Sequence, residues 1–245
     1  MKQYQHILSR LAALKLKGIA GSLDSEIDEA ESRKVSYLGF LGSLLDAEIN
    51  YRTERRMKRN LAAAHFPVVK HLEEFEFGRV KGITKSDMSV LLDFRWLDNH
   101  SNLLFFGPPG LGKTHLSIAL GMKAIAAGYT VCFERVTNLI RLLKIAEIQR
   151  TARFRVNRIM KADLVIIDEI GYTPIERKEA NLFFNLVSEL YEQASIIITS
   201  NKGFDSWAEM MGDEIMTVAL LDRLLHHSKV FNLDGESYRI KGKEV

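Results

Sequence analysis

Residues 107–114, GPPGLGKT, fit the pattern G-x-x-x-x-G-K-[ST] at every defined position. Glycines at these spacings let backbone N–H groups turn inward around phosphate, where a side chain would obstruct the turn. Lys113 supplies a cation for the β- and γ-phosphates, and Thr114 supplies a hydroxyl for Mg²⁺. The sequence therefore predicts a site for ATP and Mg²⁺ made by Gly107, Pro108, Pro109, Gly110, Leu111, Gly112, Lys113, Thr114 and His115.

A second group of chemically capable residues ends the apolar run LVIIDE, at Asp168 and Glu169. Phosphoryl transfer needs mainly positioning and charge neutralisation, so one metal holder and one water activator suffice. We expect Asp168 to hold Mg²⁺ together with Thr114, and Glu169 to polarise the attacking water. Many buried strands end in an acid, so this pair alone is a weak signal. We assign it a catalytic role because a convincing phosphate loop precedes it in the chain.

A third apolar run, SIIITSN, ends at Asn201. A side chain there would orient the attacking water or sense the γ-phosphate. The alternative is a turn-forming asparagine before Lys202-Gly203. The two preceding motifs favour the first role, in which Asn201 orients the water or senses the γ-phosphate.

Short apolar runs and helical patterns alternate from residue 103 onward. The runs LLFF (103–106), TVCF (130–133), LVII (164–167) and SIII (195–198) predict strands of a parallel sheet that is buried on both faces. The phosphate loop lies between the first of these runs and the helical stretch HLSIALGMKAIAAG. A glycine-rich turn that only resembles the motif would lack this context. The prediction is an α/β domain with a P-loop NTPase core over residues 66–245.

Residues 1–65 predict a small all-helical domain. Apolar residues recur there at helical spacing after a possible N-cap at Ser36. They are Tyr37, Leu38, Leu41, Leu44, Leu45 and Ile49, and a basic run from Arg52 to Arg59 follows. Phe66-Pro67 breaks this pattern, and HLEEFEFGRVKG then resembles a connecting arm.

Composition excludes several classes of protein. The chain has 47% hydrophobic and 27% charged residues, and no run approaches the roughly 18 apolar residues of a membrane span. The start MKQYQHILSR lacks the features of a signal peptide, and the single cysteine, Cys132, allows neither a disulfide nor a cysteine metal cluster. We expect Cys132 in a core strand and the protein in a reducing cytoplasm. The net charge of +3 permits nucleic-acid binding without requiring it.

The order GPPGLGKT, LVIIDEIGY, IIITSN, LLDRLLHHS, GESYR resembles the IstB family, the helper ATPases of insertion-sequence transposition. Helicase loaders of the DnaC type are similar as well. The resemblance implies an AAA+ core with an initiator-clade helical insertion, ATP hydrolysis, and homo-oligomers assembled on double-stranded DNA that stimulate a partner transposase. The alternative functions are a helicase loader and a nucleotide-dependent scaffold that hardly hydrolyses ATP.

The resemblance also assigns two arginines. Arg223 matches the arginine finger presented to a neighbouring subunit's ATP, and Arg239 matches the sensor-2 arginine. A helix-surface arginine beside Asp222 is the alternative for Arg223. His226 and His227 are interpreted as structural or near DNA, because adjacent residues of a helix face different directions and make a poor metal pair.

Residues 135–161 hold many arginines and lysines against a single acid, Glu147, and are long enough for two helices. This one-sided charge predicts contact with a phosphate backbone. The expected DNA-binding residues are Arg141, Lys144, Arg150, Arg153, Arg155 and Arg158. A solvated face is the alternative, although such faces usually mix both signs of charge.

Overall fold

The computed structural model describes residues 2–171 and 175–238. It divides into two compact units, Met1–Arg59 and Asn60–Val245. This division lies earlier than the predicted break at Phe66-Pro67, because the last turn of the long helix α3 (Tyr37–Ala64) belongs to the second unit. Ala63 and Ala64 are buried, and the Asn60 side-chain amide donates to the Tyr129 carbonyl over 3.4 Å.

The N-terminal unit consists of α1 (Lys2–Ala13), α2 (Lys17–Arg33) and the first part of α3. Ile19, Leu23 and Leu44 form its small core. The N-cap predicted at Ser36 is confirmed, since its Oγ accepts from the Gly39 N–H over 3.2 Å. The predicted apolar stripe divides: Leu44 is buried, while its other members, Tyr37, Leu38, Leu41, Leu45 and Ile49, are exposed.

A buried glutamate joins α3 to the start of α2. Leu16 at the N-cap of α2 makes no side-chain cap, and the Glu48 carboxylate instead accepts from the N–H groups of Gly18 (2.6 Å) and Ile19 (3.2 Å). Arg52 pairs with the same carboxylate at 2.7 Å. The bond from Arg52, with the backbone N–H groups, lowers the pKa of Glu48. Glu48 thus satisfies helix donors that would otherwise lack partners.

Replacing Glu48 with Gln is expected to destabilise the N-terminal unit in a pH-dependent way. Because the folded-state pKa is lowered, the stabilisation is complete above the unfolded pKa of about 4.3 and is lost as pH falls through the folded value. Thermal unfolding of wild type and Glu48→Gln should differ at neutral pH and converge in acid. Glu54→Gln, which removes an exposed carboxylate, is the matched control. An equal loss at every pH would contradict the electrostatic origin.

The second unit is built on a parallel sheet with the strand order β3-β4-β5-β2-β6. Its strands are β2 (Asn102–Phe106), β3 (Val131–Arg135), β4 (Leu164–Ile170), β5 (Ser195–Ser200) and β6 (Ser228–Asn232), and a separate antiparallel pair joins β1 (Val80–Lys81) to β7 (Asp234–Gly235). Its helices are α4 (Lys85–Leu91), α5 (Arg95–Asp98), α6 (Lys113–Ala127), α7 (Val136–Ile145), α8 (Arg150–Ile159), α9 (Arg177–Leu190), α10 (Trp207–Met211) and α11 (Glu214–His226), with short 3₁₀ turns η1 (Leu72–Glu74), η2 (Phe77–Arg79) and η3 (Phe204–Ser206).

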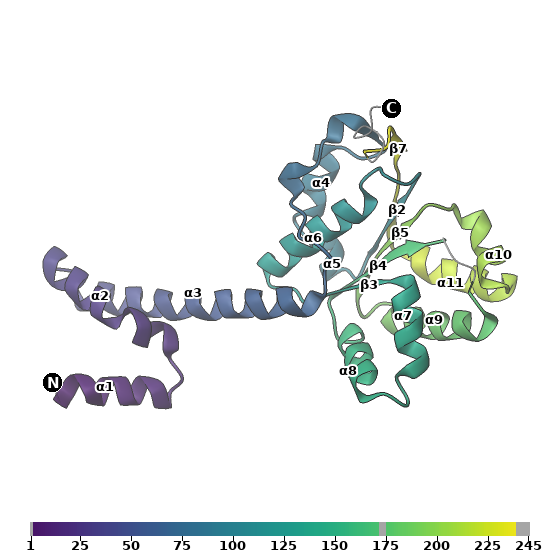
Figure 1. Ribbon diagram of the computed structural model, residues 1–245. Helices are drawn as coiled ribbons and strands as arrows, with labels where there is room; N and C mark the ends of the chain where they lie inside the picture. The colour runs from purple at the N-terminus through teal and green to yellow at the C-terminus, as the bar shows by residue number, and fades with distance from the viewer. Residues whose placement is uncertain (1, 172–174, 239–245) are drawn as a thin grey trace, which may run out of the picture. The chain divides into compact units, whose positions relative to one another are not determined.

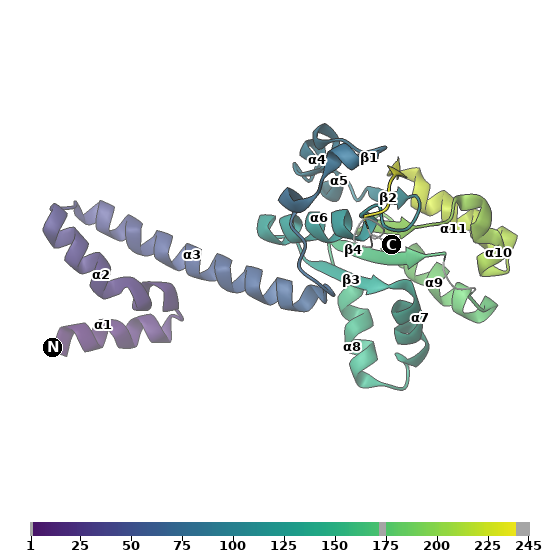
Figure 2. The same ribbon diagram turned by 45° about the horizontal axis from the view of Figure 1, so that its top comes forward.

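Alternation along the strands places two cores on opposite faces of this sheet. Leu103 and Phe105 of β2 belong to the core that includes residues of α4, α5 and α6, whereas Leu104 and Phe106 belong to the core that includes residues of α7, α9, α10 and α11. The helices around the sheet are seen in Figures 1 and 2. The predicted α/β architecture with a sheet buried on both faces is therefore confirmed. Cys132 lies in the core as expected, and burial raises the pKa of its thiol.

Candidate nucleotide site

The phosphate loop connects β2 to α6, and the loop conformation requires glycine. Gly110 has φ +85°, and a Cβ there would lie 2.0 Å from Ser237 Oγ. Gly112 has φ +83°, and a Cβ there would lie 2.5 Å from Phe75 Cε2. Both positions are left-handed and crowded, so a larger residue would distort the loop. Lys113 begins α6, and its Nζ donates to the carbonyls of Gly107 (2.6 Å) and Pro108 (2.8 Å).

Asp168 lies fully buried at the carboxyl end of β4. Its Oδ1 accepts from Thr114 Oγ1 (2.8 Å) and from Thr199 Oγ1 (2.6 Å), while its Oδ2 is buried and has no hydrogen-bond partner within the described residues. A buried carboxylate oxygen without a partner is costly, and a hard cation would satisfy it. The predicted pair, Thr114 and Asp168, is therefore brought together as a set of oxygen ligands that fits Mg²⁺. Thr199 was not predicted, although it lies within the run SIIITSN.

Glu169 follows Asp168 in a strained backbone conformation. Its φ is +65°, which is unusual for a residue with a side chain, and the pairing of β4 with β5 shifts register at this point. The Glu169 N–H donates to Thr199 Oγ1 over 2.9 Å, which helps to hold this conformation. The carboxylate is partly exposed and pairs with Arg135 Nε at 3.4 Å. The sequence indicated for Arg135 only that it belongs to a basic segment. Its contact with Glu169 arises because Arg135 is the last residue of β3 and pairs with Asp168 of β4.

Asn201 and a set of unpredicted residues complete the pocket. Asn201 directly follows β5, and its Oδ1 is buried without a hydrogen-bond partner among the described residues. A cavity of about 550 Å³ is lined by the loop, Glu169 and Asn201 together with Val68, Lys70, Phe75 and Tyr238. Phe75 packs edge-on against His115, at 5.6 Å between ring centroids. The segment expected to be a connecting arm thus forms a wall of this cavity, which is large enough for a nucleotide.

Within the predicted loop residues, Leu111 differs from its neighbours. Its side chain is fully buried in the core, so only its backbone N–H is available to a phosphate. Pro109, Gly110, Gly112, Lys113, Thr114 and His115 line the cavity directly.

Comparison with known proteins assigns the family. Residues 9–245 match the profile of the IstB-like ATP-binding proteins. The chain belongs to that family. It is 42% identical over 99% of its length to a protein of Pseudomonas aeruginosa named for ATP binding in insertion sequence IS21, and covers 91% of that protein. A counterpart of Geobacillus stearothermophilus named for insertion sequence IS5376 is 37% identical, over 95% of this chain and 92% of that protein.

Solved structures place this IstB-like chain among AAA+ proteins by fold. The crystal structure of DnaI gives a TM-score of 0.56 at 15% identity, covering 67% of this chain and 91% of that one. AMPPCP-bound DnaA from Aquifex aeolicus gives a TM-score of 0.54 at 20% identity, covering 68% of this chain and 50% of that one. The predicted AAA+ core is thereby confirmed, and the helical insertion is the α7–α8 hairpin.

The two arginines assigned by resemblance lie outside this pocket or outside the described structure. Arg223, on α11, places its guanidinium 4.9 Å from the Phe184 ring centroid and donates to the Ala219 carbonyl over 2.8 Å. It does not line the cavity around the phosphate loop of its own chain. Arg239 lies outside the described residues. Both roles remain predictions.

Arg155 was predicted to bind DNA, but in this IstB-like chain it is a buried structural residue. Its side chain is 8% exposed, and its Nε pairs with Glu134 Oε1 at 2.6 Å. The two terminal nitrogens of the guanidinium, Nη1 and Nη2, donate to the carbonyls of Ala63 (2.9 Å) and Phe133 (3.0 Å). Arg155 therefore connects α8 to β3 and to the end of α3, and its charge is unavailable to DNA. Removing one partner of such a buried pair is strongly destabilising.

The other residues of the hairpin that were predicted to bind DNA differ in their exposure and in the contacts that they already make. Lys144 pairs with Glu179 at 2.7 Å, and Arg153 donates to the carbonyls of Ala146 and Glu147. Arg141 donates to Asn138, which leaves most of its guanidinium free to reach solvent. Arg150 is exposed, and Arg158 is partly exposed.

Across the described residues, no helix combines the length and the apolar character needed to cross a membrane.

Proposed function

We propose that this IstB-like chain is a Mg²⁺-dependent ATPase that assembles into homo-oligomers on double-stranded DNA and stimulates a partner transposase. The buried carboxylate oxygen of Asp168, set beside the hydroxyls of Thr114 and Thr199 at the mouth of the phosphate loop, is the observation that supports ATP chemistry most strongly. The names of its relatives, which connect ATP binding with insertion sequences, supply the biological setting.

The residues of the pocket have separate roles in this proposal. The loop N–H groups and Lys113 bind the β- and γ-phosphates, and Thr114 with Asp168 holds Mg²⁺, which supplies charge neutralisation when bound. Glu169 polarises the attacking water, and the free Asn201 oxygen orients it. Phe75 and Tyr238 lie where they can contact the rest of the nucleotide.

Electron microscopy with ATP and duplex DNA, combined with ATP turnover with and without DNA, tests the proposal. Ordered oligomers on DNA, and transposase stimulation that requires ATP, are the expected results. A protein that binds ATP with no measurable turnover would be a scaffold. Stimulation of a replicative helicase instead of a transposase would indicate a loader, for which the likeness to DnaI supports only the fold.

The free basic residues of the α7–α8 hairpin are expected to contact the DNA backbone. Changing Arg141, Arg150 and Arg158 to Glu should weaken binding to two unrelated duplexes equally. It should also flatten the log–log dependence of affinity on salt by about 0.9 for each phosphate that is no longer neutralised. Salt titrations measure both effects. Arg155 is left unchanged because it is structural.

A variant with the same change in charge elsewhere provides the control for the hairpin. Lys85, Arg95 and Lys178 are exposed on α4, α5 and α9, and their replacement by Glu should leave the slope unchanged. A hairpin variant with the wild-type slope would identify the hairpin as a solvated face. Loss of affinity for only one duplex would indicate base readout instead.

A further inference from the structure

Two adjacent histidines and a glutamate converge at the end of α11, away from the loop pocket. His226 is the last residue of α11, and His227 is its C-cap with φ −125° and ψ 78°. Because the chain leaves the helix at His227, the two side chains are not held about 100° apart as successive residues of a helix are. Their ring centroids lie 4.1 Å apart. The expectation that these histidines face different directions is therefore wrong.

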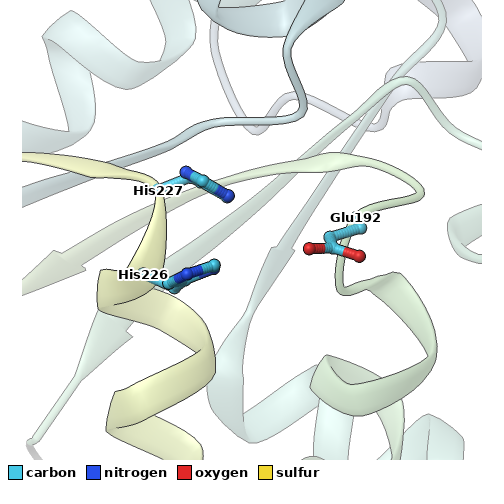
Figure 3. A group of neighbouring side chains, drawn as sticks. All are labelled: Glu192, His226 and His227. Carbon is cyan, nitrogen blue, oxygen red and sulfur yellow. The ribbon is translucent and has the colours of Figure 1, made fainter.

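Glu192 completes the group from another element. It lies in the turn between α9 and β5, at φ +56°, and its carboxylate faces the two imidazoles (Figure 3). Among the described residues, Glu192, His226 and His227 are the group whose potential ligand atoms all lie within 4.8 Å of one another. Ligands of a tetrahedral zinc ion are about 3.3 Å apart, given metal–ligand bonds of roughly 2.0–2.1 Å. Small rotations of these exposed side chains would close that difference.

Tyr191 supplies an independent observation at this group. Its hydroxyl lies 2.8 Å from His226 Nδ1. The hydroxyl oxygen can accept a hydrogen bond from Nδ1–H, which leaves the Nε2 lone pair of His226 available. Metal-bound histidines usually donate their other ring N–H to such a partner.

We propose that Glu192, His226 and His227 form a binding site for a divalent transition-metal ion of the zinc type. Two imidazoles and one carboxylate match the ligands that Zn²⁺ selects, and solvent water completes the coordination. The bound ion connects the turn after α9 to the end of α11. Arg223 lies one helical turn before His226 and packs on Phe184 of α9, so the ion would stiffen the part of the fold that carries the expected arginine finger.

Zinc titration of the full chain tests the site, with affinity measured by competition against a chromophoric chelator in the presence of Mg²⁺. Wild type should bind one Zn²⁺ per chain at this site, and His226→Ala and His227→Ala should each weaken binding at least about tenfold. Tyr191→Phe should weaken it about tenfold by removing the partner of Nδ1. His6→Ala, at an exposed position on α1, is the matched control.

Thermal unfolding separates this site from zinc bound elsewhere. Zinc should raise the unfolding midpoint of wild type and of His6→Ala but not that of His227→Ala. A ligand stabilises the folded chain only where it binds that state, and zinc binds it through the intact site. Without zinc, the midpoints of these variants should agree, since the substituted side chains are exposed. Equal zinc affinity of wild type, His226→Ala and His227→Ala, or no binding by wild type, would overturn the proposal. Neither result would bear on ATP hydrolysis.

Discussion

Replacing Glu169 with Gln is expected to lower ATP turnover by roughly 10²–10⁴-fold while ATP binding is retained. The amide keeps the size of the side chain, but it cannot accept the proton of the attacking water. Glu169 follows the buried Asp168 and is held by the bond from its N–H to Thr199, so the substitution should leave the backbone in place. The DNA-bound assembly should therefore accumulate in its ATP state.

Steady-state turnover and nucleotide binding must be measured on the same preparations. Lys113→Ala is expected to abolish binding itself, which distinguishes loss of the phosphate cradle from loss of chemistry. Glu189→Gln, on the outer part of α9, is the matched control for the change in charge. Hydrolysis by Glu169→Gln at the wild-type rate would show that another group activates the water.

The central strands were predictable because burial on both faces leaves uninterrupted apolar runs, as in LVII and SIII. The strand β6, with the sequence SKVFN, was not predicted. It lies at the edge of the sheet, and Phe231 is its buried residue, so neither an apolar run nor a clear alternation marks it. Its position depends on pairing with β2, a contact between residues distant in sequence.

The same limit explains the errors at the sites. The phosphate loop and Asp168 were predictable because local spacing encodes them. Thr199 becomes part of the site only through the pairing of β4 with β5, and Phe75 only because its segment folds over the loop. Charge composition could not distinguish Arg155 from Arg150, since the buried carboxylate that pairs with Arg155 lies on another strand.

Replacing Arg223 with Ala is expected to lower turnover by roughly 10³–10⁵-fold without loss of ATP binding, if this side chain completes the site of a neighbouring subunit. Its guanidinium stacks on Phe184 and lies away from the pocket of its own chain, as a group that acts on another subunit must. Arg223→Lys should restore little activity, because a lysine keeps the charge but lacks the planar fork of donors.

Mixing experiments decide whether Arg223 acts between subunits. Arg223→Ala retains the phosphate loop, and Lys113→Ala retains the finger, so an equal mixture creates active interfaces at about a quarter of positions in a head-to-tail assembly. Turnover should then rise well above that of either variant alone. If Arg223 only packs on Phe184, Arg223→Ala should lower the thermal midpoint, and mixing should restore nothing at any ratio. Unfolding curves measured beside the turnover assays distinguish these outcomes, since a finger stabilises the transition state and not the fold.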